Sequence, residues 1–195
     1  MSTVNPAEVP VSEPAPPDLP PLAAGLSAAR EGGSTVPRVL IVSAGVYPPD
    51  FGGGQLRVHK TLLRMRRRYP MDVEVLALSG ASPQPEWSQT DGIPVHRLPA
   101  TLGPFAMTVA IGRHLLRARR RGTDVVYTMT IGRVVYTTAL LARLLGFPLI
   151  VEIMNRNLHE KLLRRVVARQ LTRAAELVVA ISEPVAREIR ALGVA

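Results

Sequence analysis

The chain has 195 residues, of which 47% are hydrophobic, and it carries a formal net charge of +9 without a single cysteine. This length holds one domain with a sizeable core, and this hydrophobic content excludes a chain that is disordered throughout. The absence of cysteine excludes disulfides and thiolate chemistry, and it fits a reducing compartment.

The positive charge comes almost entirely from arginine, because Lys60 and Lys161 are the only lysines. A basic surface suits nucleic acid, an anionic membrane or anionic substrates. Nucleic acid is the weakest of these partners, since only 4% of residues are aromatic and no nucleic-acid-binding motif is present. The longest apolar stretch, residues 125–154, is interrupted by three charged side chains, so we expect no membrane span.

The first 37 residues hold eight prolines and four acidic residues against one basic residue, Arg30. They lack the basic start and apolar core of a signal peptide. This composition predicts a disordered Pro/Ala-rich leader at residues 1–37 and one folded domain at residues 38–195.

A glycine turn opens the folded part of the chain. Residues 39–42 are apolar and predict a buried strand, two prolines end it, and Gly52, Gly53 and Gly54 lead into a helix at Gln55. A helix start after glycines presents free N–H groups to an anion such as a diphosphate. The alternative is a loop that needs glycine for a positive φ, and this stretch alone favours neither.

Strands and helices alternate from there to the end of the chain. Further strands are predicted at residues 73–78, 95–98, 124–128, 149–153 and 177–181. Helices are predicted at residues 55–69, 103–121, 134–145, 158–174 and 183–192. Residues 79–93 are predicted as loop, and strand 95–98 is placed near an edge. The pattern predicts an α/β fold, a Rossmann-like three-layer sandwich with a mostly parallel sheet of about six strands.

The helices that follow the first, third and fifth strands carry apolar or basic stripes. Two apolar stripes are expected to face inward, namely Val58, Leu62, Met65 and Tyr69 in one helix and Leu158, Leu162, Val166 and Leu171 in another. Two basic stripes are expected on exposed faces, namely Arg57, Lys60, Arg64, Arg67 and Arg68, and Arg113, Arg117, Arg120 and Arg121. Solvated helix faces explain these stripes most simply, and contact with an anionic membrane is the functional alternative.

Several polar loops follow strand ends and should meet at one edge of the sheet. They are the glycine turn, residues 128–130, residues 154–156 and Ser182-Glu183. Ligands of parallel α/β sheets bind beyond the carboxyl ends of the strands. The shared location favours a phosphate or sugar site, with Asn155, Arg156 and Ser182 as candidate binding residues beside the glycines. Ser182 is also expected to cap the last helix through its side-chain oxygen.

Four segments together resemble the N-terminal domain of a family 4-like glycosyltransferase of GT-B architecture. They are RVLIVSAGVYPPDFGGGQLRV, DVVYTMT, LLARLLGFPLIVEI and AAELVVAISEPVAREIRALGV, in that order across residues 38–195. The resemblance implies an acceptor-side Rossmann-like domain facing a second domain that holds the nucleotide sugar. It places Gly52, Gly53 and Gly54 near the donor diphosphate and the acceptor. It also implies retention of anomeric configuration, no metal and no cofactor.

The chain departs from that family at several places. Met154 stands after the fifth strand where many members have a histidine, and Tyr127 and Met129 stand where others have histidines. Methionine neither transfers a proton nor holds a charge. The sequence ends at Ala195, before the donor-binding domain that the family would supply.

The remaining polar residues are interpreted as structural. His59, His96, His114 and His159 are expected to be packed or solvated, not catalytic. Glu152 ends a buried strand and needs a partner, for which Arg156 or Arg133 is expected.

These observations predict the acceptor-side half of a glycosyltransferase, transferring a sugar from a nucleotide diphosphate sugar to a hydroxyl acceptor. The half is expected to be inactive or weak alone, and to act with a separate donor-binding chain. A cytoplasmic protein, peripheral at the inner face of the membrane, is expected. The alternative is a degenerate, non-enzymatic module that binds a sugar phosphate or lipid phosphate. A dinucleotide-binding dehydrogenase fits poorly, because the G-x-G-x-x-G spacing is missing.

Overall fold

The computed structural model describes residues 36–47, 53–78, 85–129, 133–154 and 162–193. Its strands are β1 (Arg38–Ser43), β2 (Asp72–Leu78), β3 (Trp87–Thr90), β4 (Ile93–Leu98), β5 (Val125–Met129), β6 (Leu149–Ile153) and β7 (Leu177–Ala180). Its helices are α2 (Gly53–Arg68), α3 (Pro104–Arg120), α4 (Arg133–Leu144), α5 (Leu162–Ala174) and α6 (Glu183–Ala191). Most boundaries lie within two residues of those predicted.

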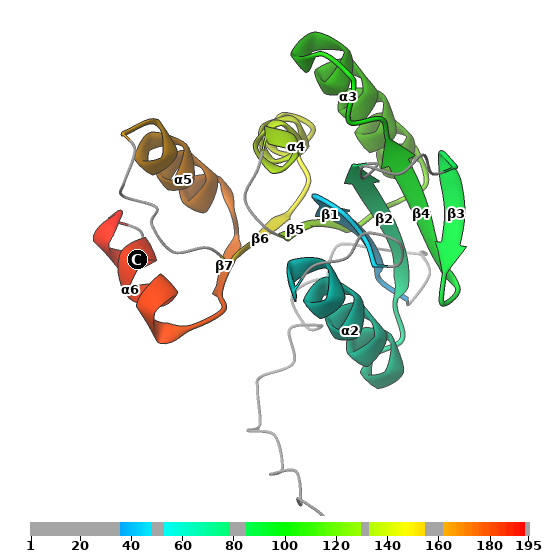
Figure 1. Cartoon of the computed structure of the whole chain (residues 1–195), viewed down its shortest axis with the longest axis horizontal. Coiled ribbons are helices and arrows are strands. Elements are labelled where there is room, and N and C mark those ends of the chain that lie inside the picture. Colours follow the sequence, from blue (N-terminus) through cyan, green and yellow to red (C-terminus); the bar gives the residue numbers. More distant parts are fainter. Residues whose placement is uncertain (1–35, 48–52, 79–84, 130–132, 155–161, 194–195) are drawn as a thin grey trace, which may run out of the picture. The chain divides into compact units, whose positions relative to one another are not determined.

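The strands form one seven-stranded sheet in the order β3-β4-β2-β1-β5-β6-β7 (Figure 1). Every neighbouring pair is parallel except β3 and β4, which are antiparallel. This arrangement confirms the predicted α/β class and the mostly parallel sheet. The central strands β1 and β5 are buried on both faces, as their continuous apolar sequences require.

The helices cover the two faces of the sheet unequally. Val58 and Leu62 of α2 pack on one face, against alternate residues of β1, β2 and β5. Residues of α3, α4, α5 and α6 pack with the other alternate residues of the same strands in a second core. Figure 1 shows α2 on one side of the sheet and α3 and α4 on the other. The two cores confirm a three-layer arrangement.

The prediction that residues 79–93 are only loop was wrong, because β3 lies within them. Strand β3 forms a hairpin with β4 through Asp91 and Gly92, whose φ angles are 49° and 71°. Two positive φ angles at an Asp-Gly pair are typical of a type I′ hairpin turn. Strand β4 is therefore the second strand of the described sheet, next to the edge strand β3, in agreement with its expected place near an edge.

Two residues predicted to face inward are exposed instead. Tyr69 lies beyond the end of α2 and is 51% exposed, and Val166 of α5 is 49% exposed. Leu171 is buried as expected, whereas Leu158 lies outside the described residues. On α2, His59 takes a buried position that the apolar pattern did not assign to it.

Candidate substrate-binding site

The carboxyl ends of β1, β5, β6 and β7 lie side by side at one edge of the sheet. The register pairs Ser43 with Met129, Met129 with Glu152, and Glu152 with Val179. These four residues form a row across the strands, at or next to the last residue of each. We call the edge that this row borders the rim. Ligands of parallel α/β sheets bind at such an edge.

Two of the three glycines in the predicted turn belong to the first turn of α2. Gly53 and Gly54 are absent from the described residues with positive φ, so the positive-φ interpretation fails for both. A Cβ atom added to either would meet nothing within 4 Å. Neither backbone conformation nor packing within the described part of the chain therefore requires glycine there. Gly52 lies outside the described residues.

A buried carboxylate at the rim connects α2 to β5 and β6. Glu152 is 1% exposed, and its Oε1 accepts a hydrogen bond from Nη2 of Arg57 at 2.6 Å. Its Oε2 accepts a hydrogen bond from the hydroxyl of Tyr127 at 2.5 Å. The structure thus gives Glu152 partners other than the expected ones. Of those, Arg156 lies outside the described residues and the side chain of Arg133 is not described.

The two partners of Glu152 differ in exposure. Burial raises the pKa of the Tyr127 hydroxyl, and the hydrogen bond to Glu152 and its negative charge raise it further, against the opposing charge of Arg57. Tyr127 therefore remains a neutral donor at physiological pH. The Arg57 side chain is 41% exposed, so its guanidinium is both anchored and open to solvent.

The sequence pattern does not reveal that Arg57, Tyr127 and Glu152 meet. In the sequence, Arg57 belongs to a basic stripe and Tyr127 is only a departure from the family. A usable signal was present, because Arg57 lies one helical turn after Gly53, where a side chain leans back toward the helix start. The pairing with Glu152 joins residues separated by 95 positions, which local patterns do not encode.

The other predicted site residues are distributed as follows. Ser182 is the N-cap residue of α6, but its side chain makes no capping hydrogen bond, so that prediction was wrong. Its carbonyl accepts from the N–H of Ala186 at 2.9 Å, and the residue follows the rim end of β7 by two positions. Asn155 and Arg156 lie outside the described residues. Of the two methionines that replace family histidines, Met129 is buried and Met154 is half-buried against the α2 core.

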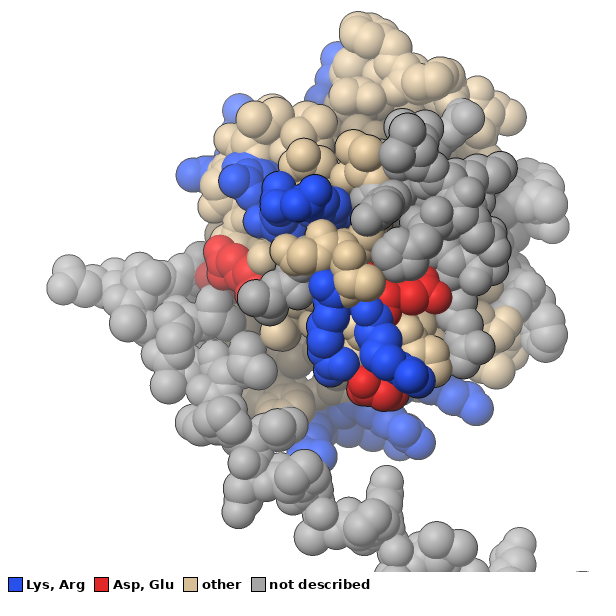
Figure 2. Space-filling view, turned by 90° about the vertical axis from the view of Figure 1, so that its left-hand side faces the viewer, with Lys and Arg blue, Asp and Glu red and all other residues tan. Residues whose placement is uncertain are grey.

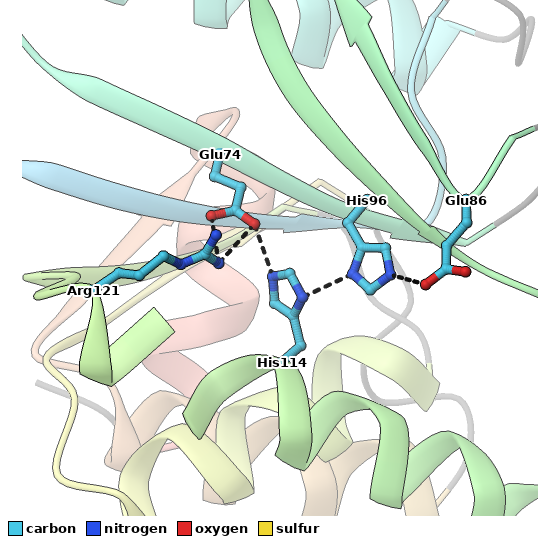
Figure 3. A network of polar contacts seen from close by, with 5 residues as sticks. All are labelled: Glu74, Glu86, His96, His114 and Arg121. Carbon is cyan, nitrogen blue, oxygen red and sulfur yellow. Dashed lines mark hydrogen bonds and ion pairs between the residues drawn. The ribbon is translucent and has the colours of Figure 1, made fainter. Parts of the chain in front are cut away.

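A second polar cluster lies on the opposite face of the sheet, between β4 and α3 (Figure 3). The Nδ1 atoms of His96 and His114 are 2.7 Å apart. Nε2 of His96 lies 3.1 Å from Glu86, and Nε2 of His114 lies 3.3 Å from Glu74. Arg121 pairs with the other oxygen of Glu74 at 2.9 Å. Both histidines are buried, which agrees with the structural role expected for them.

Among the described residues, no group of three or more His, Cys, Asp or Glu could hold a metal ion. No helix in the same part of the chain is long and apolar enough to cross a lipid bilayer.

The profile of the family described as "Glycosyl transferase 4-like domain" matches residues 52–195. The chain belongs to this family. The match begins at the glycine turn and includes the second to seventh strands and every described helix. It confirms the resemblance inferred from the four segments.

Solved structures of two other proteins share the fold of this glycosyl transferase 4-like domain. The crystal structure of Acinetobacter baumannii MurG is 18% identical, with a TM-score of 0.53 over 76% of this chain and 42% of that one. The structure of UDP-GlcNAc 2-epimerase from Methanocaldococcus jannaschii is 14% identical, with a TM-score of 0.57 over 81% of this chain and 43% of that one. The chain thus spans less than half the length of either protein. A search of curated proteins found no match.

Proposed function

We propose that this glycosyl transferase 4-like domain forms the acceptor-side half of a glycosyltransferase. The reaction would break the bond between the anomeric carbon of a nucleotide diphosphate sugar and its diphosphate oxygen. A bond to an acceptor hydroxyl oxygen would form, and the hydroxyl proton would leave. The domain would contribute placement of the acceptor and stabilisation of the departing diphosphate.

The family match over residues 52–195 is the observation that carries this proposal. The geometry of the rim supports it further, because the open positions beside Gly53 and Gly54 leave room for a ligand close to the backbone. The exposed guanidinium of Arg57 lies on the same helix. We propose Gly52, Gly53, Gly54, Asn155, Arg156 and Ser182 as residues that line the substrate.

The proposal is tested by transfer assays with labelled nucleotide sugars. Native purification from the source cell, followed by mass spectrometry, would first identify any chain that copurifies. We expect very weak or no transfer by the 195-residue chain alone, and transfer once a donor-binding domain is added. Robust turnover by the isolated chain would contradict the proposed division into halves.

A second candidate is a degenerate module that binds a sugar phosphate or lipid phosphate without catalysis. The rim methionines favour it, since Met129 and Met154 occupy positions where family members carry histidines. Binding of a sugar phosphate, without transfer in any combination of chains, would support this candidate over the first.

We also propose a cytoplasmic location, peripheral at the inner face of the membrane. The two basic helices cannot share one flat surface, because α2 and α3 pack on opposite faces of the sheet. Figure 2 shows Lys and Arg on one face of the molecule in separate groups, with acidic side chains among them. We favour the α3–α4 face, which also exposes Phe105 by 83% and Leu144 by 73%. Apolar side chains among arginines suit a lipid interface.

A further inference from the structure

The position of Arg57 combines anchoring with exposure. One guanidinium nitrogen donates to a carboxylate that is almost completely buried, while 41% of the side chain remains exposed. Arginine has five N–H donors in a planar fork, so one bond to Glu152 leaves donors for a second acceptor. Arg57 also lies one helical turn after Gly53, and long side chains in helices generally lean back toward the helix start.

Arg57 is held by a buried carboxylate, Glu152, which in turn accepts a hydrogen bond from Tyr127, and joining a helix to a sheet does not require such a network. Burying a carboxylate is unfavourable, and apolar side chains of similar size often stabilise a core as well or better. Glu152 nevertheless occupies the rim row, and each of its oxygens accepts from a different donor. The hydroxyl of Tyr127 limits rotation of the carboxylate, which in turn holds the guanidinium in one orientation.

The nearby glycines supply an independent observation. Two consecutive glycines weaken the start of a helix, yet nothing within 4 Å of a Cβ at Gly53 or Gly54 explains them in the described structure. Free backbone N–H groups at a helix start and a fixed guanidinium on the next turn both favour an anion with several oxygens.

We propose that Arg57 binds a diphosphate group at the rim, and that Glu152 and Tyr127 are positioning residues that hold its guanidinium in place. The inference rests on the proposed function and adds a specific recognition residue to it. The diphosphate could belong to a nucleotide sugar or to a lipid-linked acceptor, because both present the same pair of phosphates.

The test is a calorimetric titration of the full 195-residue chain with inorganic pyrophosphate at low ionic strength. We expect saturable binding, which Arg57→Gln weakens by about tenfold or more. Arg67→Gln removes the same charge from an exposed position at the other end of α2, and should change the affinity by less than about twofold. No saturable binding by the unmodified chain, or equal losses in both variants, would overturn the proposal.

Substitutions of Glu152 and Tyr127 distinguish the effect of positioning Arg57 from the effect of charge on pyrophosphate binding. Glu152→Gln removes a negative charge, so electrostatics alone predicts tighter binding. Glutamine, however, has one acceptor oxygen for the two donors Arg57 and Tyr127, so loss of positioning predicts weaker binding. Tyr127→Phe leaves every charge unchanged and should also weaken binding. Tighter binding by Glu152→Gln would contradict the positioning role.

Thermal unfolding of each variant shows whether it is folded. If Arg57→Gln does not fold, Arg57→Lys keeps a cation beside Glu152 but loses the planar fork, and we expect it to bind pyrophosphate several-fold more weakly. Unchanged affinity in Arg57→Lys would then count against a role for the fork.

Two further ligands identify the source of the diphosphate. Tighter binding of uridine diphosphate than of geranyl diphosphate indicates a nucleotide donor, and the reverse indicates a lipid-linked acceptor. Pyrophosphate contains no sugar, so the absence of pyrophosphate binding would reject only the proposed diphosphate site at Arg57. Failure of the transfer assays would instead remove the proposed function.

Discussion

His96 and His114 place their Nδ1 atoms 2.7 Å apart in the interface between β4 and α3 (Figure 3). At that distance one nitrogen donates and the other accepts. The outer nitrogen of each ring faces a carboxylate, Glu86 for His96 and Glu74 for His114. Protonation of both rings would place two N–H groups against each other.

This relationship predicts that acid destabilises the fold. Burial lowers the pKa of His96 below 6.5, against the hydrogen bond that His96 donates to Glu86, and the charge of His114 lowers the pKa further. The unfolded chain therefore binds more protons than the folded chain, and stability falls as pH falls through 6.5. Urea unfolding at pH 7.5 and 5.5 measures the difference, which His96→Gln should reduce.

A matched control uses the histidine on the other face of the sheet. His59 lies on α2, 2.9 Å from Asp91 and away from the His96–His114 pair. His59→Gln should therefore retain the stability difference between the two pH values. The prediction fails if His96→Gln retains that difference in full.

Glu74 predicts a further loss at lower pH. Burial raises the pKa of this carboxyl, but hydrogen bonds and positive charges from His114 and Arg121 outweigh burial and leave the pKa below 4.5. A lowered carboxyl pKa stabilises the fold above 4.5, and this contribution disappears as pH falls through the folded value. In denaturant unfolding, the Glu74→Gln variant should therefore lose less unfolding free energy below pH 4.5 than the unmodified chain does. The Asp72→Gln variant should lose as much as the unmodified chain.

Substitutions at the rim glycines should separate function from stability. Gly53→Ala has room for its methyl group, so we expect the free energy of unfolding to stay unchanged or rise by up to about 1 kcal/mol. Pyrophosphate binding should fall. Gly146→Ala is the control, because its φ of 70° and a 3.4 Å approach to Arg119 predict a loss of about 1 kcal/mol. Destabilisation by Gly53→Ala would show that the glycine has a structural role.

The β3–β4 turn should depend on Asp91 in two ways. Its φ is 49°, and its carboxylate lies 2.9 Å from His59. Asp91→Asn keeps a residue that tolerates this φ and should lose up to about 1 kcal/mol, whereas Asp91→Ala should lose about 1 kcal/mol more. Chemical denaturation of both variants measures the two contributions, and equal losses would argue against backbone strain at the turn.

Liposome cosedimentation tests the proposed membrane face. Each arginine near an anionic surface contributes about 1 kcal/mol, so the triple change of Arg113, Arg117 and Arg120 to Gln should strongly reduce binding. The same change at Arg64, Arg67 and Arg68 removes equal charge from α2, on the opposite side of the sheet, and should have little effect. Equal binding of the unmodified chain to neutral and anionic vesicles would exclude this proposal.

The sequence alone identified most of the fold, because the relevant signals are local. Apolar runs at residues 39–42 and 149–153 indicated β1 and β6, and Gly146 indicated the end of α4. In the structure Gly146 has a φ of 70°, which a glycine adopts without strain. The hairpin strand β3 was missed because Trp87-Ser88-Gln89-Thr90 has little apolar character, although the following Asp-Gly pair signals a turn.

Side-chain partnerships required the tertiary structure. Arg57 and Glu152 lie 95 residues apart, and only the packing of α2 on one face of the sheet brings the guanidinium to the carboxylate. His96 and His114 meet because α3 packs on the face of β4 that carries His96. The sequence thus determined the elements and the location of the rim, through local periodicity and strand direction. The packing of distant elements decided which charged groups are anchored there, since that depends on contacts between segments far apart in the chain.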